Sequence, residues 1–180
     1  MKTLILLRHA KSSWDDTVSR DFDRPLNAKG ERAAATMGRK LKSLGLRFDI
    51  LVASPALRVE QTLDHFGRGM GETLAPQWER RLYLASAETL LDQLRDLPDE
   101  VDTVLFAGHN PGLEDLVLML VPDSDDEPLR DSVEEKFPTA SLAEIRFDAE
   151  KWADIRARGG HLERFVRPRD LDPALGPDRD

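Results

Sequence analysis

The chain of 180 residues contains no cysteine, which removes disulfides, cysteine-ligated zinc sites and cysteine nucleophiles together. It also lacks a long hydrophobic run near its start, where the apolar stretch Leu4–Leu7 ends at Arg8. A secretory signal needs about 7–15 apolar residues and a membrane span about 20. We therefore expect a cytoplasmic protein.

The chain has few positive charges relative to negative ones: 26 Lys and Arg residues against 34 Asp and Glu residues give a net charge of −8. An acidic surface repels nucleic acid and anionic membranes, so neither is an expected partner. A basic pocket within that surface would still bind phosphate or another anion. The length predicts one domain over residues 1–167. The charged, proline-rich tail 168–180 is expected to be disordered or loosely draped over the surface.

Short apolar runs alternate with segments of helical periodicity. Strands are predicted over residues 3–7, 48–54, 73–78 and 101–108, with two late strands, antiparallel to the rest, over 140–148 and 161–168. Helices are predicted after the N-caps Asn27, Ser54 and Asn110, and over residues 86–97. The first ends at Gly45, and a proline follows each of the other two caps at the first helical position. After the last of these helices, Asp123–Glu135 in the connection 122–138 is predicted as a solvated acidic loop, and selection of a protein partner through its charge stays open as the alternative. The alternation predicts an α/β domain with a mostly parallel sheet.

Three strand ends carry residues able to bind anions. Arg8-His9 follows the first strand and His109 follows the third, while Arg58 lies one turn into the helix after the second. The carboxyl ends of parallel strands meet at one edge of a sheet, where ligands bind. Helix N-termini at the same edge add positive dipole ends. These four side chains therefore predict a convergent site for a phosphoryl group.

Phosphoryl transfer is the chemistry these residue types support. A neutral imidazole is a competent nucleophile at pH 7, so His9 would attack phosphorus. Arg8 and Arg58 would hold the nonbridging oxygens, and His109 would donate to one of them. This chemistry needs no cofactor and no metal, and no acidic cluster typical of a magnesium site follows these strands. The other two histidines, His65 and His161, are interpreted as structural or solvent-facing.

Four motifs carry a family resemblance, in order from the N-terminus to about residue 120: "LLRHAKSSW", "DRPLNAKGERAA", "ASPALRVEQT" and "FAGHNPGLEDL". Together they resemble the histidine phosphatase superfamily, also called the phosphoglycerate mutase-like fold. The "RHA" triplet, the compact length and "DRPL" are similar to its SixA-type phosphohistidine phosphatases. The resemblance implies a three-layer α/β/α domain in which His9 accepts phosphate, Arg8 and Arg58 bind it and His109 completes the pocket.

The resemblance further implies a metal-independent phosphatase that acts on phosphohistidine through a covalent phosphohistidine intermediate. Its expected partner is a histidine-phosphorylated protein, such as a phosphotransfer domain, and Lys11 and Ser12 are expected in the substrate loop. Many relatives also carry a carboxylic proton donor, for which Glu79 and Glu88 are the candidates here, and neither aligns convincingly. A missing donor suits a P–N bond, because imidazole leaves without a dedicated acid whereas an alkoxide does not.

Two rival functions stay open at this point. One is a phosphatase of a small phosphoester or pyrophosphate within the same superfamily, and the other is a non-catalytic phosphate-binding module. A haloacid-dehalogenase interpretation of "DFDRP" is disfavoured because no apolar strand precedes it. Four dispersed histidines do not have the spacing of a zinc site. The sequence does not indicate the oligomeric state.

Overall fold

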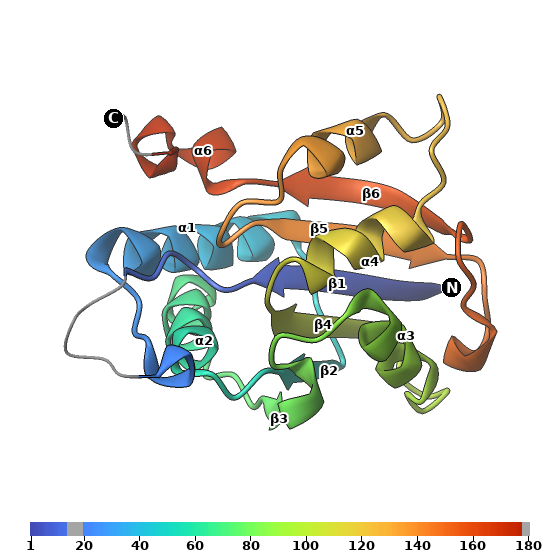
Figure 1. Cartoon of the computed structure of the whole chain (residues 1–180), viewed down its shortest axis with the longest axis horizontal. Coiled ribbons are helices and arrows are strands. Elements are labelled where there is room, and N and C mark those ends of the chain that lie inside the picture. The colour runs from blue at the N-terminus through green and yellow to red at the C-terminus, as the bar shows by residue number, and fades with distance from the viewer. Residues whose placement is uncertain (14–19, 178–180) are drawn as a thin grey trace.

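The computed structural model describes residues 1–13 and 20–177. Trp14 of the first motif and the last three residues of the predicted tail lie outside these ranges. Six strands form one mixed sheet in the order β3-β2-β4-β1-β5-β6 (Figure 1). The strands are β1 (Lys2–Arg8), β2 (Ile50–Ala53), β3 (Gln77–Trp78), β4 (Thr103–Gly108), β5 (Leu142–Phe147) and β6 (Gly160–Val166).

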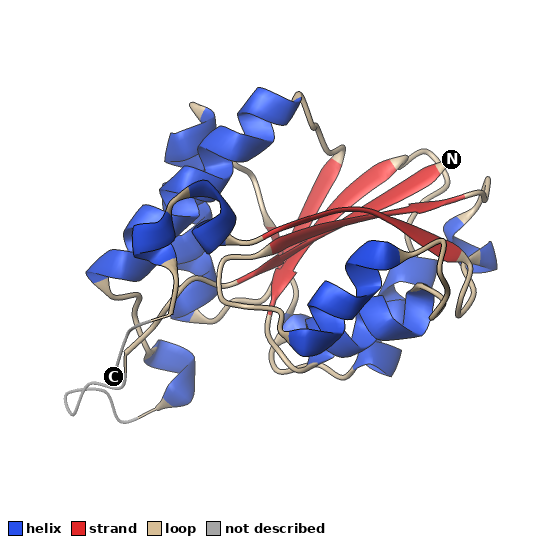
Figure 2. Cartoon of the chain, turned by 90° about the horizontal axis from the view of Figure 1, so that it is seen from above, coloured by secondary structure: helices blue, strands red, loops and turns tan. Residues whose placement is uncertain are grey.

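Helices cover both faces of this sheet (Figure 2). One face packs against α1 (Ala28–Leu44), α2 (Leu57–Met70) and α6 (Pro168–Leu171), and the other against α3 (Ala87–Arg95), α4 (Gly112–Leu120) and α5 (Pro128–Glu135). Short 3₁₀ turns lie at Asp21–Asp23, Arg80–Leu82, Trp152–Asp154 and Pro173–Leu175. The predicted three-layer α/β/α architecture is therefore confirmed.

The central strand β1 divides the core into two clusters. Leu4 and Leu6 point into the cluster beneath α3 and α4, whereas Ile5 and Leu7 point into the one beneath α1 and α2. All four side chains are 0 % exposed. Successive side chains of a strand face opposite sides of a sheet, so an unbroken apolar run is what a strand buried on both faces requires.

The strand register brings the predicted site residues to one edge. Ala53, Ala107, Leu7, Leu142 and Val166 form one row across the sheet. β2, β4 and β1 run parallel, as predicted, and β5 runs antiparallel to β1. The prediction that both late strands oppose the rest is wrong for β6. Because β6 pairs antiparallel with β5, it runs in the direction of β1, and its C-terminal end reaches the same edge.

Helix α1 begins and ends as predicted. The Asn27 side chain accepts a hydrogen bond from the Gly30 amide at 2.8 Å, and Gly45 ends the helix in the left-handed conformation (φ 67°). The predicted cap at Ser54 is wrong, because α2 begins at Leu57, after Ala56. Helix α4 begins at Gly112, after Pro111, so Asn110 is one residue outside the cap position, but its side chain accepts a hydrogen bond from the Glu114 amide at 3.2 Å.

The prediction of a solvated loop over Asp123–Glu135 holds for the exposed residues 123–126 and is wrong for residues 127–135. Residues Pro128–Glu135 form α5, and Val133 and Phe137 are completely buried. The buried Glu127 carboxylate accepts a hydrogen bond from the Leu162 amide at 3.1 Å. Two apolar residues among many acidic ones anchor this helix to the core, a pattern too sparse to predict it.

The expectation of a disordered or loosely draped tail is wrong for residues 168–177. Helix α6 packs against α1, and Leu171 packs against the core beneath α1 and α2. The Lys29 ammonium donates a hydrogen bond to the Gly176 carbonyl oxygen. This segment therefore forms part of the domain next to the strand ends.

Candidate active site

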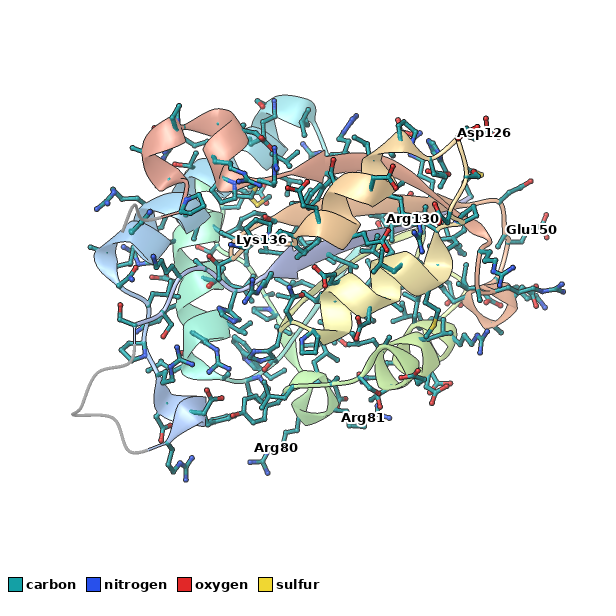
Figure 3. The ribbon with its side chains drawn as sticks, turned by 45° about the horizontal axis from the view of Figure 1, so that its top comes forward. Arg80, Arg81, Asp126, Arg130, Lys136 and Glu150 are labelled. Atoms are coloured by element: carbon teal, nitrogen blue, oxygen red, sulfur yellow. The ribbon has the colours of Figure 1, made fainter. Side chains whose placement is uncertain are left out.

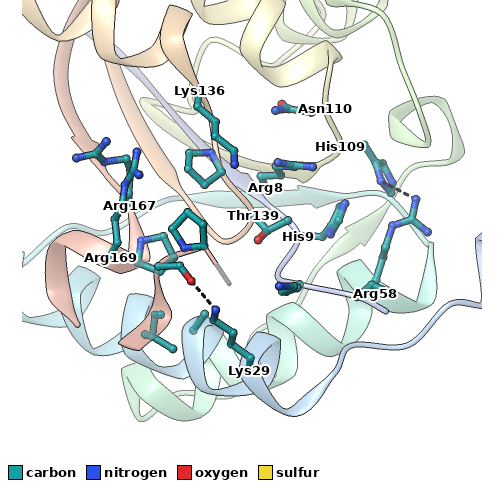
Figure 4. A pocket seen from close by; sticks show the side chains of 18 of the residues that line it. Arg8, His9, Lys29, Arg58, His109, Asn110, Lys136, Thr139, Arg167 and Arg169 are labelled. Atoms are coloured by element: carbon teal, nitrogen blue, oxygen red, sulfur yellow. Dashed lines mark hydrogen bonds between the residues drawn. The ribbon is translucent and has the colours of Figure 1, made fainter. Parts of the chain in front are cut away.

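One cavity of about 620 Å³ lies at the edge where the strands end (Figure 4). The four predicted site residues, Arg8, His9, Arg58 and His109, all line it. Eight of the lining side chains are Lys or Arg. The cavity is therefore basic although the whole chain carries a net charge of −8.

His9 is held in one tautomer. Its Nδ1 lies 2.7 Å from the Ala10 carbonyl oxygen. A carbonyl oxygen can only accept, so Nδ1 carries the proton and Nε2 keeps its lone pair. Burial, reinforced by the neighbouring guanidinium charges, lowers the pKa of His9 to about 3, although the hydrogen bond to Ala10 acts in the opposite direction. At neutral pH, His9 is an uncharged imidazole with a free nitrogen.

Arg58 and His109 form a buried pair, each 3 % exposed. Arg58 Nη2 donates to His109 Nδ1 at 3.3 Å. The proton of His109 then sits on Nε2, which donates to the Ser54 hydroxyl at 2.8 Å. Burial, followed by the charge of Arg58, lowers the pKa of His109 to about 3. Ser54, predicted as a helix cap, instead orients His109.

Arg8 is fixed by the segment that follows α5. Its Nη1 donates to the Phe137 carbonyl oxygen at 2.9 Å, and the Asn110 side chain donates to the same oxygen at 2.9 Å. The Ala140 amide donates to the carbonyl oxygens of Arg8 and His9. The Nε atoms of Arg8 and of Arg58 are buried, and neither has a hydrogen-bond partner among the described residues. Both guanidinium groups thus keep donors for an anion.

Asp21 is a site residue that the sequence interpretation missed. Its carbonyl oxygen accepts from Arg58 Nη1 at 2.8 Å, and its Oδ2 accepts from Arg58 Nη2 at 3.0 Å. The hydroxyl of Tyr83 donates to the same carboxylate oxygen at 2.5 Å. Burial opposes ionisation of this carboxyl, but hydrogen bonds from Tyr83 and two arginines outweigh it and lower the pKa of Asp21 to about 2. Asp21 is therefore an ionised anchor for Arg58.

The available signals for this anchor were "DFDRP", considered only as a rival motif, and the single tyrosine of the chain. Both proton-donor candidates lie elsewhere. Glu79 caps the turn at Arg80–Leu82 and pairs with Arg81, and Glu88 is exposed in the first turn of α3. Within residues 1–13 and 20–177, the only carboxylate lining the cavity is Asp21.

The predicted substrate loop does reach the cavity, since Lys11 and Ser12 both line it. The Ser12 hydroxyl donates to the Pro25 carbonyl oxygen at 2.6 Å, which ties this loop to the chain before α1.

Over the described residues, no group of three or more His, Asp or Glu side chains is arranged to hold a metal ion. In the same part of the chain, no helix is long and apolar enough to cross a membrane.

Comparison with known proteins identifies the family. A domain model described as histidine phosphatase superfamily (branch 1) matches residues 4–83. An uncharacterized protein of Mycobacterium tuberculosis is 35 % identical over 165 residues, which span 91 % of this chain and 100 % of the relative. The chain belongs to the histidine phosphatase superfamily.

Solved structures place this histidine phosphatase with the SixA type. A putative phosphohistidine phosphatase SixA from Nakamurella multipartitia superposes with a TM-score of 0.79 at 28 % identity, covering 93 % of this chain and 96 % of that one. One from Agrobacterium tumefaciens gives 0.75 at 29 % identity, covering 93 % and 98 %. The predicted superfamily, the SixA type and the phosphoglycerate mutase-like fold are confirmed, and the protein is a phosphatase of this superfamily.

Proposed function

We propose that this phosphatase removes phosphate from phosphohistidine in a protein, through a covalent intermediate on His9. The observation that carries the proposal is the state of His9, a neutral imidazole whose Nδ1 is tied to Ala10 at 2.7 Å and whose Nε2 is free. It lies in a cavity lined by Arg8 and Arg58. Two guanidinium groups beside an uncharged nucleophile suit attack on a phosphoryl group.

The reaction has two steps. His9 Nε2 attacks phosphorus, its new P–N bond forms as the P–N bond of the substrate breaks, and the leaving imidazole takes a proton from solvent. Water then attacks the phosphorus of phosphorylated His9, which releases inorganic phosphate and restores the neutral imidazole. Charge-assisted hydrogen bonds from Arg8 and Arg58 would each contribute about 1.5–3 kcal/mol to holding the phosphoryl oxygens.

His109 supports this reaction by donating to a nonbridging oxygen. That role requires the proton on Nδ1, the atom that now accepts from Arg58 at 3.3 Å. The Ser54 hydroxyl, 2.8 Å from Nε2, can accept a hydrogen bond or donate one. The same contact therefore stabilises either tautomer, and His109 can turn from acceptor to donor when Arg58 binds phosphate.

The choice of phosphohistidine rests on the leaving group. Asp21, the carboxylate lining the described part of the cavity, has a pKa of about 2 and is held by Arg58 and Tyr83. It is unprotonated at neutral pH and cannot act as a general acid. Imidazole leaves without one, whereas an alkoxide does not. The proposal includes a histidine-phosphorylated partner, such as a phosphotransfer domain, and the cytoplasmic location expected from the sequence.

The test compares kcat/KM for a phosphohistidine peptide with that for hexyl phosphate, with EDTA present throughout. We expect the phosphohistidine substrate to be favoured at least a hundredfold, because only its leaving group manages without an acid. His9→Ala should abolish turnover of both. Faster hydrolysis of the alkyl ester would contradict the proposed substrate, and near-normal turnover by His9→Ala would contradict the nucleophile.

One observation favours the alternative of a small phosphoester. The cavity, at about 620 Å³, extends well beyond the four site residues and carries further cations at its outer end. A compact molecule with two anionic groups would fit such a space. In that case the alkyl ester would be the faster substrate, and its proton would have to come from solvent or from a group outside the described residues.

A further inference from the structure

The cationic side chains of the cavity fall into an inner and an outer group. The inner one is the site around His9. The second, here called the outer cationic wall, consists of Lys29, Lys136, Arg167 and Arg169. In Figure 4 this wall lies on the opposite side of His9 from Arg58. Lys136 stands at the C-terminal end of α5, and Figure 3 shows it well away from Asp126 and Glu150, which lie toward the right-hand end of the view.

The sheet register sets the spacing between the two groups. Val166 is opposite Leu142, which is opposite Leu7, so the first and last of these are two strands apart. Adjacent strands are about 4.8 Å apart, which separates the two backbones by roughly 10 Å. Arg8 directly follows the inner member of this row, and Arg167 directly follows the outer one.

Two members of the wall are occupied in holding it together. Arg167 pairs with Asp170 through Nη2 and Oδ1 at 2.8 Å, within the capping box of α6. Lys29 donates to the Gly176 carbonyl oxygen and so joins α1 to the end of the described chain. These contacts fix the segment 167–176 as one side of the cavity.

The other two members present charge to the cavity. Neither Lys136 nor Arg169 forms a salt bridge with a described residue, although the charge of Arg169 contributes to the low pKa of nearby Asp170. The Nε atom of Arg169 is buried and has no hydrogen-bond partner in the described part of the chain. Arg8 and Arg58, the predicted phosphate ligands, have the same feature, and so does Arg164, which does not line the cavity. Because Arg169 does line the cavity, its donors can bind an anion there.

We propose that Lys136 and Arg169, on the side of the cavity away from Arg58, bind a second anionic group of the substrate, a carboxylate or a phosphate. This inference deepens the proposed function, because both groups belong to one substrate. In a phosphohistidine protein the second group is an Asp or Glu side chain near the phosphorylated histidine. In a small molecule it is a second phosphate.

The experiment measures two ratios of kcat/KM, each independent of the amount of folded enzyme. The first compares phosphohistidine peptides with Glu or with Gln three residues on either side of the phosphohistidine, since an extended chain advances about 3.3 Å per residue. The second compares hexane-1,6-diol bisphosphate with hexyl phosphate. Both are measured for the wild type and for Lys136→Gln/Arg169→Gln. The matched control, Lys151→Gln/Arg156→Gln, removes two exposed cations that do not line the cavity.

In the wild type and in the control, we expect kcat/KM to be about tenfold higher for the substrate of each pair that carries the second anionic group. In the Lys136→Gln/Arg169→Gln enzyme, this ratio should fall to about one. If the wild type prefers the Glu peptides over the Gln peptides, the second group belongs to an acidic protein segment. If it shows a preference only in the bisphosphate pair, the second group belongs to a small molecule. Wild-type ratios near one in both pairs, or a preference that survives the double substitution, would overturn the outer subsite. If no peptide is dephosphorylated but the bisphosphate preference is lost in the variant, the phosphohistidine proposal fails while the subsite stands.

Discussion

Asp21 holds Arg58 through its carbonyl oxygen at 2.8 Å and its carboxylate at 3.0 Å, and Tyr83 holds Asp21 in turn. Sequence motifs predict Arg58 because it lies at a fixed position in its helix. They do not predict Asp21, since the contact joins residues 37 positions apart and depends on where the turn Asp21–Asp23 packs. At the scale of single residues, the motifs predict the inner residues that line the cavity but not the groups that orient them.

This anchor predicts how an Asp21→Asn enzyme behaves. The amide keeps the size of the side chain but removes the charge that aligns Arg58, so we expect kcat/KM for phosphohistidine to fall roughly tenfold. The inhibition constant of inorganic phosphate should rise by a similar factor, because the same guanidinium binds phosphate. Asp21→Glu should restore part of both. Unchanged phosphate inhibition in Asp21→Asn would show that Arg58 needs no anchor.

The two site histidines predict a pH dependence of stability. Burial lowers the folded-state pKa values of His9 and His109 from 6.5 to about 3. Between these pH values the unfolded chain binds more protons than the folded one, so stability falls as the pH falls through this window. From pH 7 to pH 5 we expect a loss on the order of 1–2 kcal/mol per histidine. Urea unfolding at both pH values measures it, and His9→Gln/His109→Gln should lose clearly less than the wild type.

At the scale of elements, the positions of the strands were predictable, but the direction of one strand and the presence of one helix were not. Apolar runs predict β1, β2 and β4, because a strand buried on both faces has to be continuously apolar. The direction of β6 was not predictable from its own residues, since it follows from pairing with β5. Helix α5 was missed because its acidic composition hides the buried Val133. Errors of this kind arise where tertiary contacts, rather than local sequence, decide the structure.

Close packing at the start of α1 predicts that a substitution of Gly30 lowers both stability and activity. Gly30 packs so closely on the loop after His9 that a Cβ there would lie 2.2 Å from the Lys11 carbonyl oxygen. Gly30→Ala must therefore move the loop or the helix, at a cost of about 1–3 kcal/mol. We expect Tm to fall by roughly 2–12 °C and kcat/KM by at least tenfold. Gly159→Ala, where the nearest atom is 3.1 Å away, is the matched control. Equal effects of the two substitutions would contradict the account.

At the scale of the whole molecule, an acidic chain surrounds a basic cavity. The cations come from the end of β1 and the loop after it, from α1 and the chain before it, from α2, from the end of α5 and from the segment after β6. Net charge alone predicted that any anion site would have to be a local pocket. Arg8 and Arg58 were predictable because they follow parallel strands. Arg167 and Arg169 were not, because their place depends on the direction of β6 and on the packing of the residues after it, and Lys136 was not, because helix α5 was missed.

Rapid quenching shows whether His9 accepts the phosphoryl group. Wild-type enzyme would be mixed with a phosphotransfer protein carrying ³²P-phosphohistidine, quenched in alkali within milliseconds, digested and mapped. We expect labelled enzyme to appear before phosphate is released, with the label on His9 in a bond that is stable to alkali and labile to acid. Phosphate release with no labelled enzyme at any time, or a label on another residue, would contradict the assignment of His9 as the nucleophile.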